Sequence, residues 1–96
     1  MTIQKIFNEK MKPFEKVEQH VEFQDDKTQI YFELQEGSPR VLISFLDTED
    51  KEVMSKTVPA MAFIKPYTNK AKLYIINTSE KEDQVKFKVV TGVRLL

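Results

Sequence analysis

The chain has 96 residues, 15 basic and 15 acidic side chains, and no cysteine. This length fits a single domain with one hydrophobic core, so we expect residues 1–96 to form one unit. The absence of cysteine excludes disulfide bonds, thiolate metal sites and cysteine nucleophiles.

The first twelve residues have a pattern of their own. Ile3, Ile6, Phe7 and Met11 recur at steps of three and four residues, which is the spacing of one helix face, and Pro13 forbids continuation of a helix. We therefore predict a short amphipathic helix or arm over residues 1–12, ahead of a β domain over 14–96. Such a short helix is marginal alone, so Ile3, Phe7 and Met11 should dock on their own domain or on a neighbouring subunit.

Alternation of apolar and polar side chains dominates the rest of the chain and is clearest in Val85 to Val89. Successive side chains of a strand point to opposite faces, so this alternation predicts half-buried strands. Residues 60–64 lie between Pro59 and Pro66 and fit an edge strand, a crossing loop or a helical turn. The other predicted strands span residues 15–24, 29–35, 41–46 (an inner strand, because both of its faces are apolar), 53–58, 71–77 and 84–91.

These strands predict an all-β fold, an antiparallel β-sandwich of about six to seven short strands with a short N-terminal helix. Parallel strands are buried on both faces and would give continuous apolar runs instead. We expect the last two strands to pair as a hairpin. On its alternation, this segment over residues 72–89 resembles the closing hairpin of many jelly-roll and immunoglobulin-like modules, so the sandwich is expected to be of one of these two kinds.

Candidate metal ligands are few. Glu18, His20 and Glu22 share one face of a predicted strand, but a transition-metal site needs a further strong ligand and there is no second histidine. The acidic residues of 47–52, or Asp25 with Asp26, offer oxygen ligands for calcium without the spacing of a known calcium loop. Solvated surface explains both groups better, so we predict no metal and no cofactor.

The sequence also lacks the motifs of catalysis. None of its serines lies in a nucleophile-elbow context, and no glycine-rich phosphate loop is present. A sandwich of this size also has little room for an enclosed, water-free site. We therefore predict a protein that is not an enzyme.

The predicted hairpin defines a candidate binding surface. It would place aromatic, aliphatic and cationic side chains on one outer face, a larger apolar cluster than a monomer usually exposes. Tyr31 lies on the outward side of its own strand and would extend this face. The predicted partner-binding residues of the hairpin are Lys72, Tyr74, Ile76, Lys86 and Lys88.

We expect a non-enzymatic protein-interaction module that binds a protein partner or itself. Its size fits a small phage-encoded or bacterial protein that assembles into a larger particle or inhibits a host factor by occlusion. One alternative is a module that binds carbohydrate or calcium through Tyr31, Tyr67 and the acidic loops. A second is single-stranded nucleic-acid binding, against which the formal net charge of zero counts.

The expected location is cytoplasmic or virion-associated. The longest apolar run, residues 60–64, is far shorter than the roughly 20 residues that cross a bilayer. Residues 1–10 also lack the apolar segment of a secretion signal. We therefore expect no contact with a membrane.

Overall fold

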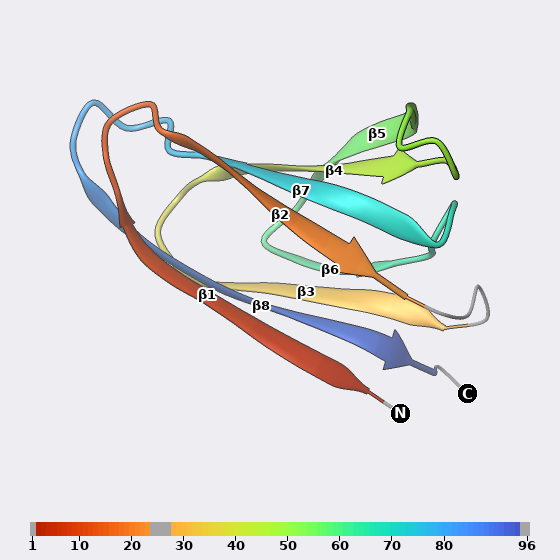
Figure 1. The fold of residues 1–96 in the computed structure, drawn as a ribbon. Helices are drawn as coiled ribbons and strands as arrows, with labels where there is room; N and C mark the ends of the chain where they lie inside the picture. The colour runs from red at the N-terminus through yellow and green to blue at the C-terminus, as the bar shows by residue number, and fades with distance from the viewer. Residues whose placement is uncertain (1, 24–27, 95–96) are drawn as a thin grey trace.

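The structure is a computed structural model that describes residues 2–23 and 28–94. These residues form two antiparallel four-stranded sheets, stacked one on the other, and contain no helix (Figure 1). The prediction of an all-β antiparallel sandwich is confirmed, but six to seven strands is wrong, because the described residues contain eight. They are β1 (Ile3–Met11), β2 (Lys16–Glu22), β3 (Gln29–Glu36), β4 (Arg40–Leu46), β5 (Glu52–Val58), β6 (Met61–Ile64), β7 (Lys70–Ile76) and β8 (Asp83–Val93).

Strands from distant parts of the chain meet in each sheet. The first sheet has the order β1-β8-β3-β6 and the second sheet has the order β2-β7-β4-β5. Consecutive strands therefore usually lie in different layers, and β4 with β5 is the one consecutive pair that shares a ladder in the described residues. The strand expected to be central, β4, is indeed flanked on both sides, by β7 and β5.

The predicted N-terminal helix is wrong, because Ile3–Met11 forms a nine-residue edge strand that pairs with β8 along its whole length. Phe7 lies opposite Phe87, and the two rings stack with centroids 4.8 Å apart. Ile3, Phe7 and Met11 share one strand face as readily as one helix face, since they are spaced by four residues. Nine residues of ladder and a buried aromatic stack outweigh the weak stability of about three helical turns.

The predicted hairpin of the last two strands is also wrong. β7 pairs with β2 and β4 in the second sheet, whereas β8 pairs with β1 and β3 in the first. Residues 77–82 thus carry the chain from one layer to the other. Sequence alternation reports which face of a strand is buried, and it does not report which strand lies beside it.

The segment between the two prolines, undecided from the sequence, is a short edge strand. β6 has four residues and pairs with β3 at the end of the first sheet. Within residues 2–23 and 28–94 there is no helix of the length and apolar character that a membrane span requires.

The core lies between the two sheets and is made of the inward-facing side chains of both. Apolar residues of all eight strands are almost completely excluded from solvent, although β2, β5 and β6 contribute only one each to this cluster, Val21, Val58 and Ile64. Phe87 is central, since its ring contacts Phe7 on one side and Phe32, at 5.0 Å, on the other. The largest fully buried apolar side chains are Met11, Phe32, Ile43, Phe45, Leu73, Ile75, Val85 and Phe87.

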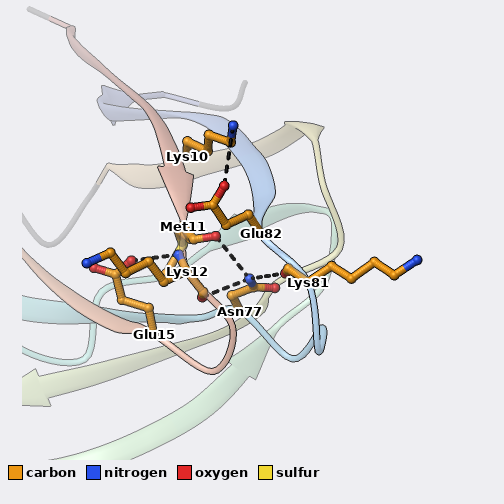
Figure 2. Close-up of polar contacts among 7 residues, drawn as sticks. All are labelled: Lys10, Met11, Lys12, Glu15, Asn77, Lys81 and Glu82. Carbon is orange, nitrogen blue, oxygen red and sulfur yellow. Dashed lines mark hydrogen bonds and ion pairs between the residues drawn. The ribbon is translucent and has the colours of Figure 1, made fainter.

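A buried asparagine joins two of the turns at one end of the sandwich (Figure 2). The Asn77 side chain is 1% exposed, and its amide nitrogen donates to the carbonyl oxygens of Lys12 at 2.9 Å, Lys81 at 3.1 Å and Met11 at 3.3 Å. Its Oδ1 accepts from the backbone N–H of Ser79 at 3.1 Å. Because an amide nitrogen has two hydrogens, one of them is shared between two carbonyls.

The same asparagine is also held by its own backbone. The N–H of Asn77 donates to the carbonyl of Glu15 at 2.9 Å, within the turn that joins β1 to β2. Glu15 closes that turn by accepting a hydrogen bond on Oε1 from the Lys12 N–H at 2.9 Å. Asn77 therefore fixes the β1–β2 turn against the loop between β7 and β8, and so fixes one sheet against the other.

Gly37 occupies a backbone position that other residues cannot take. Its φ is +90°, and a Cβ added there would lie 2.6 Å from the carbonyl oxygen of Gln84 on β8. Both the left-handed backbone and the close approach require glycine at the turn between β3 and β4.

We predict that Asn77→Ala lowers the free energy of unfolding by about 2–3 kcal/mol, because buried and partly buried carbonyls of both turns lose their donor. Denaturant unfolding measures this loss. Asn69→Ala removes an exposed amide for which the structure gives no side-chain hydrogen bond, and it should change stability by less than about 0.5 kcal/mol. Equal effects of the two substitutions would contradict the structural role of Asn77.

Gly37→Ala should destabilise the protein by about 1–3 kcal/mol from backbone strain alone, with the clash against Gln84 in addition. The exposed neighbour Ser38→Ala is the matched control and should be close to neutral. Thermal unfolding of both variants gives the comparison, and a melting temperature of Gly37→Ala equal to that of the control would show that the turn relaxes freely.

Candidate protein-interaction surface

The structure divides the predicted binding residues between opposite sides of the sandwich. Lys72, Tyr74 and Ile76 lie on the outer face of the second sheet, because the alternate residues of β7 are buried. Lys86 and Lys88 lie on the outer face of the first sheet, for the same reason on β8. The single surface expected from a hairpin is therefore not formed.

The N-terminal residues are divided as well. Phe7 and Met11 point inward and are 7% and 0% exposed, so they belong to the core. Ile3 shares their strand face but lies at the end of β1, where 53% of it is exposed. The surface stripe expected of a helix does not exist in this structure.

Tyr31 does meet Lys88, as part of an apolar surface on the first sheet. Tyr31 on β3 lies between Phe63 on β6 and Val90 on β8, and its ring centroid is 4.8 Å from that of Phe63. One row further along the strands, Glu33 lies between Met61 and Lys88, and Ile6 of β1 lies on the other side of Lys88. We name the apolar members of these rows the outer apolar patch: Ile6, Tyr31, Met61, Phe63 and Val90.

The patch exposes much of its apolar area. Ile6 is 55% exposed, Phe63 52% and Met61 62%. Aromatic residues and methionine are enriched in the centres of protein interfaces, whereas a solitary exposed apolar residue is ordinary. Here one such residue lies on β1 and two lie on β6, at the two edges of the first sheet, and Val90 and Tyr31 lie on the strands between them.

An ion pair lies in the middle of the outer apolar patch. Lys88 Nζ is 3.1 Å from Glu33 Oε2, and both side chains are less than one-third exposed. Lys88 Nζ also lies 5.7 Å from the centroid of the Tyr31 ring. Partial desolvation raises the pKa of Tyr31, as do the charge of Glu33 and a hydrogen bond to its carboxylate, while Lys88 opposes this rise. The charges in this face are thus already matched within the protein.

The outer face of the second sheet has a different character. Tyr74 and Ile76 are half-buried; Tyr74 lies between Glu18 and Leu42, and Ile76 lies between Lys16 and Arg40. Lys16 Nζ lies 4.6 Å from the centroid of the Tyr74 ring, and Lys72 lies 3.9 Å from Glu18. Lys16 and Lys72 on this face are engaged locally rather than presented to a phosphate backbone.

The acidic groups considered for calcium serve the loops that contain them. Asp47 Oδ1 accepts from the N–H of Glu49 at 2.8 Å and of Lys51 at 3.0 Å. Asp50 is paired with Lys70, and this hydrogen bond and charge lower the pKa of Asp50. Among the described residues, no group of three or more histidine, cysteine or acidic side chains gathers around a common point. Asp25 and Asp26 lie outside the described residues.

A cleft of about 1460 Å³ opens between the two sheets, beside the edge strands β1 and β2. Ile3 and Lys5 of β1 and Gln19 of β2 line it, together with Phe23 and Arg94. Gln19 Oε1 is inaccessible to solvent and has no hydrogen-bond partner among the described residues. Tyr67, considered above for sugar binding, lies elsewhere, with its ring against Phe45.

Four members of the outer apolar patch are absent from the predicted site, namely Ile6, Met61, Phe63 and Val90. Ile6 was assigned to a helix, where it joined the stripe of Ile3 and Phe7. Met61 and Phe63 alternate with Ala62 and Ile64, which is a strand signal, but four residues are too few to decide the secondary structure. Their position beside β3 depends on pairing between segments that are distant in sequence, which the local pattern does not report.

The ionisation of Tyr31 tests the geometry of the patch. In a Tyr67→Phe/Tyr74→Phe background Tyr31 is the one tyrosine left, so ultraviolet absorbance of the phenolate reports it alone. Glu33→Gln should lower the pKa of Tyr31 but leave it above the ordinary value, since desolvation is the largest cause of the shift. Glu18→Gln, on the other sheet, should leave it unchanged. An identical titration with and without Glu33 would mean that the two side chains do not interact.

Comparison of the sequence with models of protein families and with curated proteins finds no significant match. Assignment of a function to this chain therefore rests on the geometry and chemistry of its own residues.

Proposed function

We propose that the sandwich is a jelly roll. Eight antiparallel strands in two sheets of four are the composition of that fold, and the connections cross repeatedly between the layers. Immunoglobulin-like sandwiches have seven or nine strands, with unequal sheets in the seven-stranded type. The strand orders β1-β8-β3-β6 and β2-β7-β4-β5 therefore support the first of the two kinds expected from the sequence.

We further propose that the protein is a non-enzymatic interaction module that binds a protein partner through the outer apolar patch. The observation that carries this proposal is the exposure of Ile6, Met61 and Phe63 around Tyr31 on one face. Jelly rolls are also used by capsid and lectin domains, which is an analogy at the level of the fold alone. Assembly into a particle and inhibition of a host factor both require such a non-catalytic contact surface.

The Glu33–Lys88 pair supports a partner with an apolar centre. A charge buried by a partner without a counter-charge is costly, whereas this pair is already formed at 3.1 Å. A partner can therefore cover Tyr31 and Phe63 without supplying charges of its own at the middle of the contact. Lys86, half-buried on the same face of β8, lies beyond the patch and offers one cation to the rim.

Affinity capture with matched variants tests this proposal. The wild-type chain, Phe63→Ser and Ile76→Ser are immobilised in parallel and exposed to extracts of a plausible host, and the retained proteins are quantified by mass spectrometry. We expect one partner to be retained by the wild type and Ile76→Ser and to be lost by at least about tenfold from Phe63→Ser, because central aromatic residues carry much of the binding energy. In a titration, the purified partner should then bind the wild type and Ile76→Ser with similar affinity and bind Phe63→Ser more weakly.

Ile76 is the matched control because it is an aliphatic residue on the opposite outer face of the sandwich. Thermal unfolding of both variants verifies that each is folded. Retention that is lost from Ile76→Ser and kept by Phe63→Ser would move the binding surface to the second sheet. Equal retention by all three chains would refute a contact at either face.

A further inference from the structure

Within residues 2–23 and 28–94, two strand edges on the same side of the sandwich have no neighbouring strand. β1 is the edge of the first sheet and β2 is the edge of the second, and the β1–β2 turn joins them (Figure 1). The inter-sheet cleft opens between these two edges, and Ile3, which lines it, is 53% exposed. An unpaired strand edge presents backbone donors and acceptors that can pair with another strand.

Both edge strands are complementary to themselves. β1 has its midpoint at Phe7, with Lys5 two residues before it and Glu9 two residues after it. When two copies of β1 pair antiparallel about Phe7, each Lys5 lies opposite Glu9 of the other copy. The nine residues then overlap completely, and both side chains of this pair are exposed in the single chain.

β2 repeats this arrangement about Gln19. Antiparallel pairing of two copies places Lys16 opposite Glu22 and Glu18 opposite His20, while Val17 meets Val21 on the inward face. The two Gln19 side chains then face each other, so that the amide nitrogen of one can donate to Oε1 of the other. That oxygen is the buried acceptor that lacks a partner within the described chain.

We propose that this side of the sandwich is the interface of a symmetric dimer, in which β1 pairs with β1 about Phe7 and β2 pairs with β2 about Gln19 in a second copy of the chain. A two-fold axis perpendicular to one sheet relates antiparallel strands, and since the sheets are stacked, one axis serves both edges. Each four-stranded sheet becomes half of an eight-stranded sheet, and the clefts, which lie toward the Ile3 end of β1, come to opposite ends of the interface.

The charges favour this register over those centred on Lys5 or Glu9. Pairing of β1 about Lys5 would place Lys5 against Lys5, and pairing about Glu9 would place Glu9 against Glu9; directly opposed like charges destabilise a sheet. Pairing about Phe7 also places Phe7 of one copy opposite Phe7 of the other. Because each Phe7 stacks on Phe87 of its own chain, the four rings form one row of aromatic cross-strand pairs. Outward-facing Ile6 then has Ile6 of the second copy as a diagonal neighbour.

The other two edges are less suited to this pairing. β6 has only four residues. On β5, Lys56 lies opposite inward-facing Ile43 of β4, yet it is exposed, and an inward-pointing lysine on an edge discourages strand addition.

Dimerisation through β1 and β2 goes beyond the proposed function, because it uses strand edges and leaves the outer apolar patch free for a partner.

Charge reversal and charge exchange test the dimer. Sedimentation velocity over roughly 1–500 µM should show reversible dimerisation of the wild type, since strand pairing buries less than a standard interface and gives modest affinity. Glu9→Lys and Glu22→Lys, which each create two like-charge pairs per dimer, should each weaken dimerisation by about tenfold. Lys5→Glu/Glu9→Lys and Lys16→Glu/Glu22→Lys restore opposite charges in the same register and should recover most of the affinity.

Lys56→Glu is the matched control, because it changes the charge of an exposed edge lysine on the far side of the second sheet. Hydrogen exchange should show protection that rises with protein concentration in residues 3–11 and 16–22 and not in 61–64. A wild type that remains monomeric throughout overturns the proposal, as does a charge exchange that fails to restore association. Phe63→Ser should dimerise normally. A negative result for the dimer is therefore distinguishable from a negative result for partner binding by the outer apolar patch.

Discussion

The structure depends on one buried side chain that holds its two layers together. The described strands form no ladder between the two sheets, so the orientation of one sheet against the other relies on apolar packing and on the connections at their ends. Asn77 is the polar contact at one such end, where its amide and backbone bond to both the β1–β2 turn and the loop after β7. Because hydrogen bonds have narrow geometry, Asn77 defines how the layers meet, which apolar contacts alone leave less specified.

The sequence was sufficient for the class of the fold and for most strand faces, because alternation is a local property. Tyr31, Tyr74 and Lys88 are predicted to face outward, and the residues that alternate with them, Phe32, Leu73 and Phe87, are almost fully buried. The sequence was insufficient for β1. Ile3, Phe7 and Met11 are spaced by four residues, which fits one face of a helix as well as one face of a strand, and Ile6 adds a further apolar residue at helical spacing. The deciding factor was the nine-residue ladder with β8, which lies more than seventy residues away and leaves no trace in the N-terminal segment.

The candidate site was predictable only in part, for the same physical reason. Tyr31 and Lys88 were recognised as outward-facing, and the structure brings them together. Tyr74 was recognised as outward-facing too, but a short loop between two strands was mistaken for a hairpin. A loop of this length also spans the distance between stacked sheets, about 10 Å, and Asn77 at its start anchors the crossing. Which sheet a strand joins is decided by pairing partners remote in sequence.

The strand orders carry a consequence for how the chain reaches this state. Only β4 and β5 are both consecutive and paired among the described strands; every other ladder joins segments separated by at least one whole strand. Closing such distant pairs costs chain entropy before any contact repays it, so folding belongs to the slow regime of milliseconds to seconds typical of non-local β topologies. During that interval unpaired strands are open to wrong partners, and β4–β5 is the one ladder among the described strands that closes locally.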